Sequence, residues 1–345
     1  MTVRTISHVE LMTEDADGAL GYFVSAFGFT PVARAERPDR TSTLLRGGLN
    51  IVVTAPRGAG PVRDYLDGHG DGIADVAFTC DDPADVMRRA IAAGARAFPA
   101  GTLGAPAVEG FGAVRHTLLP TSVADPGWLP GAGWHRLGPV PPVGADLGLD
   151  HVAVCLTAGT LRDTVAHYER AFGFEWFSGE YIEVGAQAMD SIVVRTGDGA
   201  TFTMIEPDPS HEPGQIDDFL RGNNGPGVQH LAFTVSDIVA AVRELSSRGV
   251  GFARTPGSYY DTLQARVGHL DEQLGDLRET SVLADRDEWG YLLQIFTRPP
   301  HSRPTLFYEL IQRHDARGFG SNNIRALYEA VERLRAESLT GSGRA

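Results

Sequence analysis

Three residues in the second half of the chain carry side chains that could together hold a metal ion. His151 lies in "LDHVAV", His230 in "VQHLAF" and Glu309 in "TLFYELIQR", and they are evenly spaced along the sequence. Two imidazoles and one carboxylate on one face of an ion leave the other face open for substrate and oxygen, as in non-heme Fe(II) oxygenases. The three residues therefore predict an iron site if the fold brings them together.

Each of these residues also has a simpler explanation. A single histidine on an apolar strand is commonly a hydrogen-bonded core residue rather than a ligand. Glu309 is harder to explain in this way, because charged side chains are almost never fully buried unless they are paired. The spacing alone leaves both explanations open, so the choice depends on the elements that carry the three side chains.

Those elements occur twice in the chain. Residues 6–33 and residues 149–177 each contain a short apolar strand, a turn, an amphipathic helix and the letters "AFGF" before another strand. A second repeat relates residues 69–98 to residues 223–252, each with an Asp before its helix as an expected N-cap. Such duplication predicts that the chain consists of two related halves.

The two halves differ in the residues that could bind a metal. His8 corresponds to His151, but Asp75 stands where the second half has His230. The first half has no clear counterpart of Glu309. We therefore expect the first half to be a scaffold without metal, in which His8 has a structural role.

The repeated pattern predicts an α+β fold of four βαβββ modules, arranged in two pairs that form two open barrels. The stretch "DPGWLPGAGWHRLGPVPPVGADLG" is rich in Pro and Gly and is interpreted as a linker. The expected division is a scaffold pair over residues 1–124, the linker over 125–148, a catalytic pair over 149–318, and a gating helix with the tail over 319–345.

The composition limits the partners of this 345-residue chain. Its formal charge of −14 argues against nucleic acid and anionic membranes, because both would repel it. The N-terminus lacks a signal-peptide pattern, and no run approaches the roughly 18 apolar residues of a membrane helix. Cys80 and Cys155 lie in apolar runs without zinc or redox spacing. These features predict a soluble cytoplasmic protein.

The paired modules resemble the vicinal-oxygen-chelate superfamily, and the second half resembles its 4-hydroxyphenylpyruvate dioxygenase family. The motifs "GVQHLAF", "LLQIFT" followed by Arg-Pro, "TLFYELIQR" and "GFGSNNIRALYEAVE" carry this resemblance over residues 149–334, whereas the first half matches mainly by architecture. The resemblance implies that His151, His230 and Glu309 bind Fe(II), with O2 as co-substrate. It implies no need for 2-oxoglutarate, because an aromatic 2-oxo acid substrate supplies its own oxo acid.

The resemblance also assigns residues around the metal. The expected substrate-binding residues are Ser191, Thr203, Ile205, Gln215, Gln294, Phe307 and Phe319, and the expected catalytic residues are Gln294, Asn323 and Ile324. A terminal helix over residues 322–334 would cover the mouth of the pocket. Phe307 and Phe319 could instead be plain core aromatics, which is the commoner role of such residues. His269, His301 and His314 lie in polar stretches and are expected to be exposed to solvent.

Two departures from the family pattern concern the product. The chain has "TMIEP" where the homogentisate-forming enzymes have "PINEP", and "FGSNNI" where they have "FGxGNF", so that Ile324 replaces a Phe. Both departures, with "GAQAMDS" at residues 185–191, resemble the branch that forms 4-hydroxymandelate. A displacement on the order of an ångström redirects such chemistry between a ring carbon and the benzylic carbon. The expected reaction is therefore conversion of 4-hydroxyphenylpyruvate and O2 to 4-hydroxymandelate and CO2.

Other functions remain open at this point. Formation of homogentisate is the alternative within the family. A metal-free protein that binds small molecules on the same scaffold is a second alternative, and extradiol cleavage of a catechol is a third. The sequence leaves the oligomeric state open, with a homodimer as one candidate.

Overall fold

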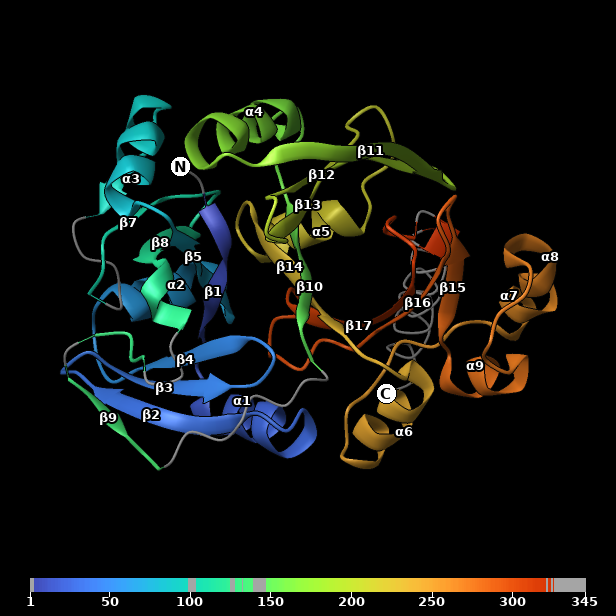
Figure 1. Cartoon of the computed structure of the whole chain (residues 1–345), viewed down its shortest axis with the longest axis horizontal. Coiled ribbons are helices and arrows are strands. Elements are labelled where there is room, and N and C mark those ends of the chain that lie inside the picture. The colour runs from blue at the N-terminus through green and yellow to red at the C-terminus, as the bar shows by residue number, and fades with distance from the viewer. Residues whose placement is uncertain are drawn as a thin grey trace, which may run out of the picture.

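The computed structural model shows two curved mixed sheets that lie side by side, one from each half of the chain (Figure 1). The residues it describes are 3–98, 104–124, 128–131, 133–138, 147–320, 322, 323 and 325. Among these residues, no helix is long and apolar enough to cross a membrane.

The first sheet has nine strands in the order β6-β7-β8-β5-β1-β4-β3-β2-β9. Their bounds are β1 (Val3–Met12), β2 (Thr30–Glu36), β3 (Arg40–Arg46), β4 (Asn50–Pro56), β5 (Gly72–Cys80), β6 (Ala97–Phe98), β7 (Ala107–Glu109), β8 (Arg115–Pro120) and β9 (Trp134–Arg136). Strand β9 lies within the predicted linker and extends this sheet by pairing with β2.

The second sheet has eight strands in the order β11-β12-β13-β10-β14-β17-β16-β15 and is strongly curved (Figure 1). Their bounds are β10 (Leu149–Cys155), β11 (Glu175–Val184), β12 (Gln187–Arg195), β13 (Thr201–Pro207), β14 (Gly227–Thr234), β15 (Leu283–Arg286), β16 (Tyr291–Phe296) and β17 (Phe307–His314).

The helices lie between the strands in sequence. The α-helices are α1 (Ala16–Gly21), α2 (Pro61–His69), α3 (Pro83–Ala92), α4 (Leu161–Phe172), α5 (Gln215–Gly222), α6 (Ile238–Ser247), α7 (Gly257–Asp261), α8 (Leu263–Val267) and α9 (Leu274–Thr280). A short π-helix, η1 (Tyr22–Ala26), continues α1, and a 3-10 turn, η2 (Thr121–Ala124), follows β8.

Each sheet consists of two βαβββ modules. The modules of the first sheet begin at β1 and β5 and contain α1 and α3, and those of the second begin at β10 and β14 and contain α4 and α6. In both sheets the two opening strands pair antiparallel, and each also pairs in parallel with the last strand of a module. The predicted α+β fold of paired βαβββ modules is confirmed.

The repeated capping residues explain why the helices begin and end at corresponding places. Asp82 and Asp237 each accept a backbone N–H at the start of α3 and α6, an arrangement that typically stabilises a protein by about 1 kcal/mol. Gly28 and Gly173, the glycines of the two "AFGF" stretches, have φ angles of 75° and 76°. Because residues with a Cβ rarely adopt this conformation, glycine lets both helices turn directly into the next strand.

The halves share one core. Aromatic side chains from both sheets pack together, for example Phe78 against Phe202 with ring centroids 6.1 Å apart. Within this core, Tyr168 of the second half hydrogen-bonds to His116 of the first at 2.5 Å. The second sheet is thereby held against the first.

Candidate metal centre

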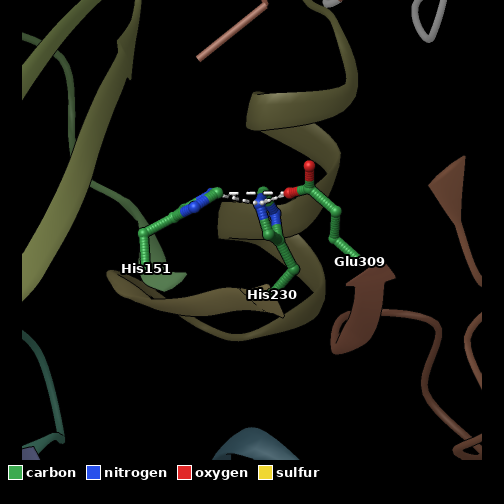
Figure 2. Close-up of side chains that lie close together, drawn as sticks. All are labelled: His151, His230 and Glu309. Atoms are coloured by element: carbon green, nitrogen blue, oxygen red, sulfur yellow. Dashed lines mark hydrogen bonds and ion pairs between the residues drawn. The ribbon is translucent and has the colours of Figure 1, made fainter. Parts of the chain in front are cut away.

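His151, His230 and Glu309 lie on three neighbouring strands, β10, β14 and β17, of the second sheet (Figure 2). Ala232 of the middle strand pairs with both His151 and Glu309. His230 lies two residues before Ala232 and therefore on the same face of the strand. Strand register, rather than closeness in sequence, brings the three side chains to one point.

The potential ligand atoms converge closely. Glu309 Oε2 lies 3.4 Å from His151 Nε2 and 3.2 Å from His230 Nε2, and the two Nε2 atoms are 3.4 Å apart. All three side chains are buried. Among the described residues, these three form the one group of His, Cys, Asp and Glu side chains whose ligand atoms lie close enough together to hold an ion. The fold thus brings together the three residues that the sequence singled out.

The charges at this point are shifted by burial and by mutual contact. Burial alone would raise the pKa of Glu309, but the contacts with His151 and His230 outweigh it and lower that pKa. Burial lowers the pKa of His230. Burial would also lower the pKa of His151, yet Asp150 and Glu309 raise it to about 9. An ionised carboxylate and two imidazoles that face one point are a donor set that suits a divalent cation.

Both histidines are oriented through their other ring nitrogen. Asp150 Oδ1 lies 2.8 Å from His151 Nδ1, and Gln229 Oε1 lies 3.2 Å from His230 Nδ1. Asp150 and Gln229 are the extra residues of two β-bulges between β10 and β14, which turn them toward the histidines. With Nδ1 donating to these oxygens, Nε2 of each ring faces Glu309 and is the atom that an ion would bind in place of a proton.

Asp150 is in turn held by an arginine. Arg313 Nε and Nη2 donate to its two oxygens at 2.7 and 2.8 Å. Burial would raise the pKa of Asp150, but the bonds from Arg313 and His151 hold it well below its usual range. The carboxylate therefore remains ionised as an acceptor for His151.

A cavity of about 50 Å³ opens beside the three residues. It is lined by five residues that were expected in the pocket, namely Thr203, Ile205, Gln215, Gln294 and Phe319, and by Met189, Ile216, Gln229 and Phe296. A neighbouring cavity of about 200 Å³ shares Thr203 and Phe319 with it and reaches Ser191, Phe177 and Trp289. The two cavities therefore lie next to each other, with Thr203 and Phe319 in the walls of both.

Two buried polar atoms of this lining have no hydrogen-bond partner within the described part of the chain. They are Thr203 Oγ1 and Gln294 Oε1. Buried polar atoms are normally paired, so such atoms beside a cavity mark places where a ligand can complete the bonding. Gly320 approaches Gln294 so closely that a Cβ there would lie 2.7 Å from Oε1.

The remaining predicted residues have other positions. Phe307 stacks on the His230 ring, with centroids 5.0 Å apart, and is not part of either cavity lining. Asn323 is buried outside the two linings, and its Oδ1 accepts from the hydroxyl of Tyr259 at 2.8 Å. Ile324 and most of the predicted terminal helix lie outside the described residues.

Sequence reasoning missed several residues of the site. Phe296 lines the cavity and lies 5.8 Å from the His230 ring. It follows Gln294 by two residues on β16, so strand alternation could have placed it on the same face. Gln229 carries no such signal, because a bulge cannot be read from the alternation of the strand.

The prediction that His301 is exposed to solvent is wrong. Its side chain is only 6% exposed and lies between Asp71 Oδ2, at 3.3 Å, and the Tyr308 hydroxyl, at 3.1 Å. Asp71 belongs to the first half of the chain and Tyr308 to the second. Contacts between the halves therefore bury a histidine that its polar sequence neighbours made appear free.

Comparisons with known proteins agree with this geometry. Residues 1–119 match the family model of the hydroxyphenylpyruvate dioxygenase N-terminal domain, and residues 148–295 match that of the glyoxalase/bleomycin resistance protein/dioxygenase superfamily. The 4-hydroxyphenylpyruvate dioxygenase of Dictyostelium discoideum is 31% identical over 358 residues, which cover 94% of this chain and 96% of the relative. That of Pyricularia oryzae is 34% identical over 300 residues, covering 79% and 71%.

The chain belongs to the 4-hydroxyphenylpyruvate dioxygenase family. Among solved structures of relatives, a mutant of 4-hydroxymandelate synthase from Streptomyces coelicolor matches with a TM-score of 0.88 and 53% identity, over 96% of this chain and 99% of that one. A xylose isomerase-like TIM barrel/4-hydroxyphenylpyruvate dioxygenase fusion protein matches with a TM-score of 0.75 and 26% identity, over 97% and 52%. The family predicted from the motifs is confirmed, and the first half matches it in sequence as well as in architecture.

Proposed function

We propose that this protein is an Fe(II)-dependent enzyme that converts 4-hydroxyphenylpyruvate and O2 to 4-hydroxymandelate and CO2. The observation that carries the proposal is the 53% identity to a 4-hydroxymandelate synthase over nearly the whole of both chains. By comparison, the two 4-hydroxyphenylpyruvate dioxygenases named above are only 34% and 31% identical to this chain. The buried triad of His151, His230 and Glu309 supports the metal requirement.

The residues present fit an iron ion. Their two nitrogens and one oxygen converge from one side, and the cavity lies beside them. Held by these three residues, Fe(II) would supply the chemistry that oxidises a 2-oxo acid with O2. The chain itself supplies the three ligands and the bulge residues that orient both imidazoles.

The cavity walls suit an aromatic 2-oxo acid. Ile205, Phe296 and Phe319 present apolar surface that holds a ring and excludes water. Thr203 Oγ1 and Gln294 Oε1 are the polar atoms available to the oxygens of the substrate. The neighbouring cavity, with Ser191 in its wall, gives room for the far end of the substrate.

The choice of product is proposed to depend on the walls that hold the ring. Thr203 and Ile205 lie on one face of β13 and line the cavity, in the motif where the chain departs from the homogentisate-forming pattern. Ile324 is the second departure. Both outcomes begin from the same decarboxylation, so the position of the ring decides between them. The wall formed by Thr203 and Ile205 would present the benzylic carbon, rather than the ring carbon, to the oxidant.

The test is incubation of the purified protein with Fe(II), 4-hydroxyphenylpyruvate and air, followed by identification of the product. We expect oxygen consumption, release of CO2 and formation of 4-hydroxymandelate. Ile324→Phe and Ile205→Asn, alone and together, are expected to shift the product toward homogentisate. Homogentisate as the sole product of the unchanged protein would contradict the proposal and favour the alternative that its dioxygenase relatives suggest.

A metal-free binding protein on the same scaffold predicts a different result. Such a protein would bind the aromatic acid equally well without metal, and His230→Ala would leave its affinity unchanged. Under the proposed function, 4-hydroxyphenylpyruvate binds more tightly when Fe(II) is present, measured without oxygen so that no reaction occurs. His230→Ala is expected to remove that difference in affinity. Calorimetric titration with and without Fe(II) distinguishes the two.

A further inference from the structure

Arg313 lies on β17, four residues after Glu309, and places its guanidinium between two segments of chain. Its Nε and Nη2 donate to the two oxygens of Asp150 on β10. Its Nη1 donates to the backbone oxygens of Ala316, at 3.2 Å, and Gly318, at 2.6 Å. One side chain therefore ties the strand of a metal-ligand candidate to the turn that follows β17.

Both sets of contacts lead back to His151. On one side, Asp150 Oδ1 lies 2.8 Å from His151 Nδ1. On the other side, the turn carries Phe319, whose ring lies 5.0 Å from the guanidinium carbon of Arg313. The same Phe319 ring meets the His151 ring edge to face, with centroids 5.1 Å apart and planes at 88°. The contacts form a closed circuit through His151, Asp150, Arg313 and Phe319.

The turn is well suited to transmit a change at Arg313. Its carbonyls are held by Arg313, and the N–H groups of Arg317 and Gly318 are both held by Asp287 Oδ2 at 2.7 Å. The turn carries Phe319 into the walls of both cavities and Gly320 against Gln294. Loss of the carbonyl contacts would leave the turn held by Asp287 and by the bridge between Asp315 and Tyr291.

We infer that Arg313 is a positioning residue that couples the orientation of His151 to the placement of Phe319 on the pocket wall. The inference rests on the proposed metal site. An ion on His151 Nε2 fixes the imidazole, which fixes Asp150 and Arg313 and thereby the turn over residues 315–320. Because such coupling is reciprocal, a well-placed turn strengthens metal binding by the same free energy. Lysine cannot replace Arg313 here, since it lacks the planar fork that reaches Asp150 and two carbonyls at once.

The first measurement is the affinity of the full-length, metal-free protein for Co(II), an ion that accepts the same ligand types. Arg313→Lys and Asp150→Asn are each expected to weaken binding about tenfold, as is common when the partner of a ligand histidine is changed. The losses are expected to be less than additive in the double variant, because Arg313 and Asp150 belong to one circuit of contacts. Arg286→Lys is the matched control and is expected to bind Co(II) like the unchanged protein.

Arg286 suits this comparison because it makes similar contacts elsewhere in the same sheet. It donates to the backbone oxygens of Val267 and His269 and lies over the Tyr291 ring at 5.2 Å. Additive losses in the double variant, or equal losses in Arg286→Lys and Arg313→Lys, would overturn the inference.

The second measurement is hydrogen exchange in peptides that cover residues 315–320. Co(II) is expected to slow this exchange in the unchanged protein and to have little effect in Arg313→Lys. In the metal-free state, Arg313→Lys is expected to speed the exchange, whereas Asp150→Asn leaves the carbonyl contacts of Arg313 in place and changes it little. Equal exchange with and without bound Co(II) in the unchanged protein would overturn the inference.

Failure of the proposed metal site is distinguishable from failure of this inference. No Co(II) binding by the unchanged protein would contradict both. Normal Co(II) binding by Arg313→Lys, with tight binding by the unchanged protein, would contradict the inference alone. Circular dichroism identifies any variant that fails to fold, and the nearly isosteric Asp150→Asn then carries the test.

Discussion

The two halves of the molecule place different side chains on the same framework of strands. His8 pairs with Ala77 as His151 pairs with Ala232, and both histidines follow a bulged residue. Asp75 occupies the position of His230, beside a second bulge in each half. The backbone that aligns the metal-ligand candidates is therefore present twice.

The third position completes this correspondence. Strand β8 pairs in parallel with β5 in a register that places Thr117 opposite Ala77, as Glu309 lies opposite Ala232. Thr117 donates through its N–H and its hydroxyl to the two oxygens of Asp75, at 3.0 and 2.5 Å. The first half thus satisfies its carboxylate internally, whereas the second half directs three ligand atoms to one point.

The histidines differ in a similar way. Burial lowers the pKa of His8 to about 3, so the ring is neutral, and its Nδ1 lies 3.2 Å from the hydroxyl of Ser7. Ser7 is the bulged residue that corresponds to Asp150. A neutral hydroxyl beside His8 and an anchored carboxylate beside His151 show that the strand geometry alone does not make a metal site. The side-chain types at the shared positions decide it.

The strongest test of this comparison converts the second site into the first. His230→Asp together with Glu309→Thr reproduces the pair formed by Asp75 and Thr117. We expect metal binding to fall more than about 100-fold, while the protein stays folded. Glu309 and one imidazole are lost, and the new carboxylate would be hydrogen-bonded by the new threonine, as Asp75 is by Thr117. Metal content after dialysis and thermal unfolding measure the two effects. Retention of one tightly bound ion per chain would contradict the assignment of the ligands.

The Asp75 carboxyl gives the next largest effect, on stability. Burial raises its pKa to about 7, against the hydrogen bonds from Thr117. The unfolded chain therefore ionises at lower pH than the folded one, so the folded protein loses stability as pH rises toward 7. Asp75→Asn removes this loss. From pH 5 to pH 8, the free energy of unfolding of the variant is expected to rise by about 2 kcal/mol relative to that of the unchanged protein.

Urea unfolding of the metal-free protein at both pH values measures this difference. Asp190→Asn, at a partly exposed aspartate on β12, serves as the control. The difference in the free energy of unfolding between Asp75→Asn and the unchanged protein could instead be the same at both pH values. That result would show that the Asp75 carboxyl is ionised in the folded state throughout.

A smaller effect is expected when the support of His151 is made like that of His8. Asp150→Ser replaces the anchored carboxylate by the hydroxyl found at Ser7. We expect about tenfold weaker metal binding, because a carboxylate partner orients the imidazole and makes it a stronger ligand. Competition with a chelating indicator measures the affinity. Unchanged affinity would show that the carboxylate is not needed to orient His151.

The smallest predicted effect concerns the residue that lies beside the middle ligand. Phe307 pairs with His230 and stacks on its ring, whereas Arg115 pairs with Asp75 at the corresponding position. Phe307→Leu keeps an apolar neighbour but removes a ring contact of the order of 1 kcal/mol. We expect metal affinity to fall a few-fold in the same competition measurement. A loss as large as that of Asp150→Ser would mean that stacking, rather than hydrogen bonding, fixes the histidines.

Much of the fold followed from local sequence patterns. The repeated "AFGF" stretches and the Asp before each helix predicted the paired modules, because capping and turn formation depend on neighbouring residues. Alternation along β13 explains why Thr203 and Ile205 share a face and line the same cavity. The placement of Asn323 outside both cavity linings was not foreseen, since it depends on contact with Tyr259 in α7, which is distant in the sequence.

The sequence by itself determined which side chains could bind a metal and on which repeated elements they stand. Only the tertiary structure decided that Asp150 and Gln229 turn toward the two histidines, that Arg313 joins Asp150 to the turn before Phe319, and that His301 is buried between the halves. The physical reason is range. Helix caps and strand alternation depend on residues a few positions apart, whereas bulges, strand register and buried ion pairs depend on segments that meet only after the chain has folded.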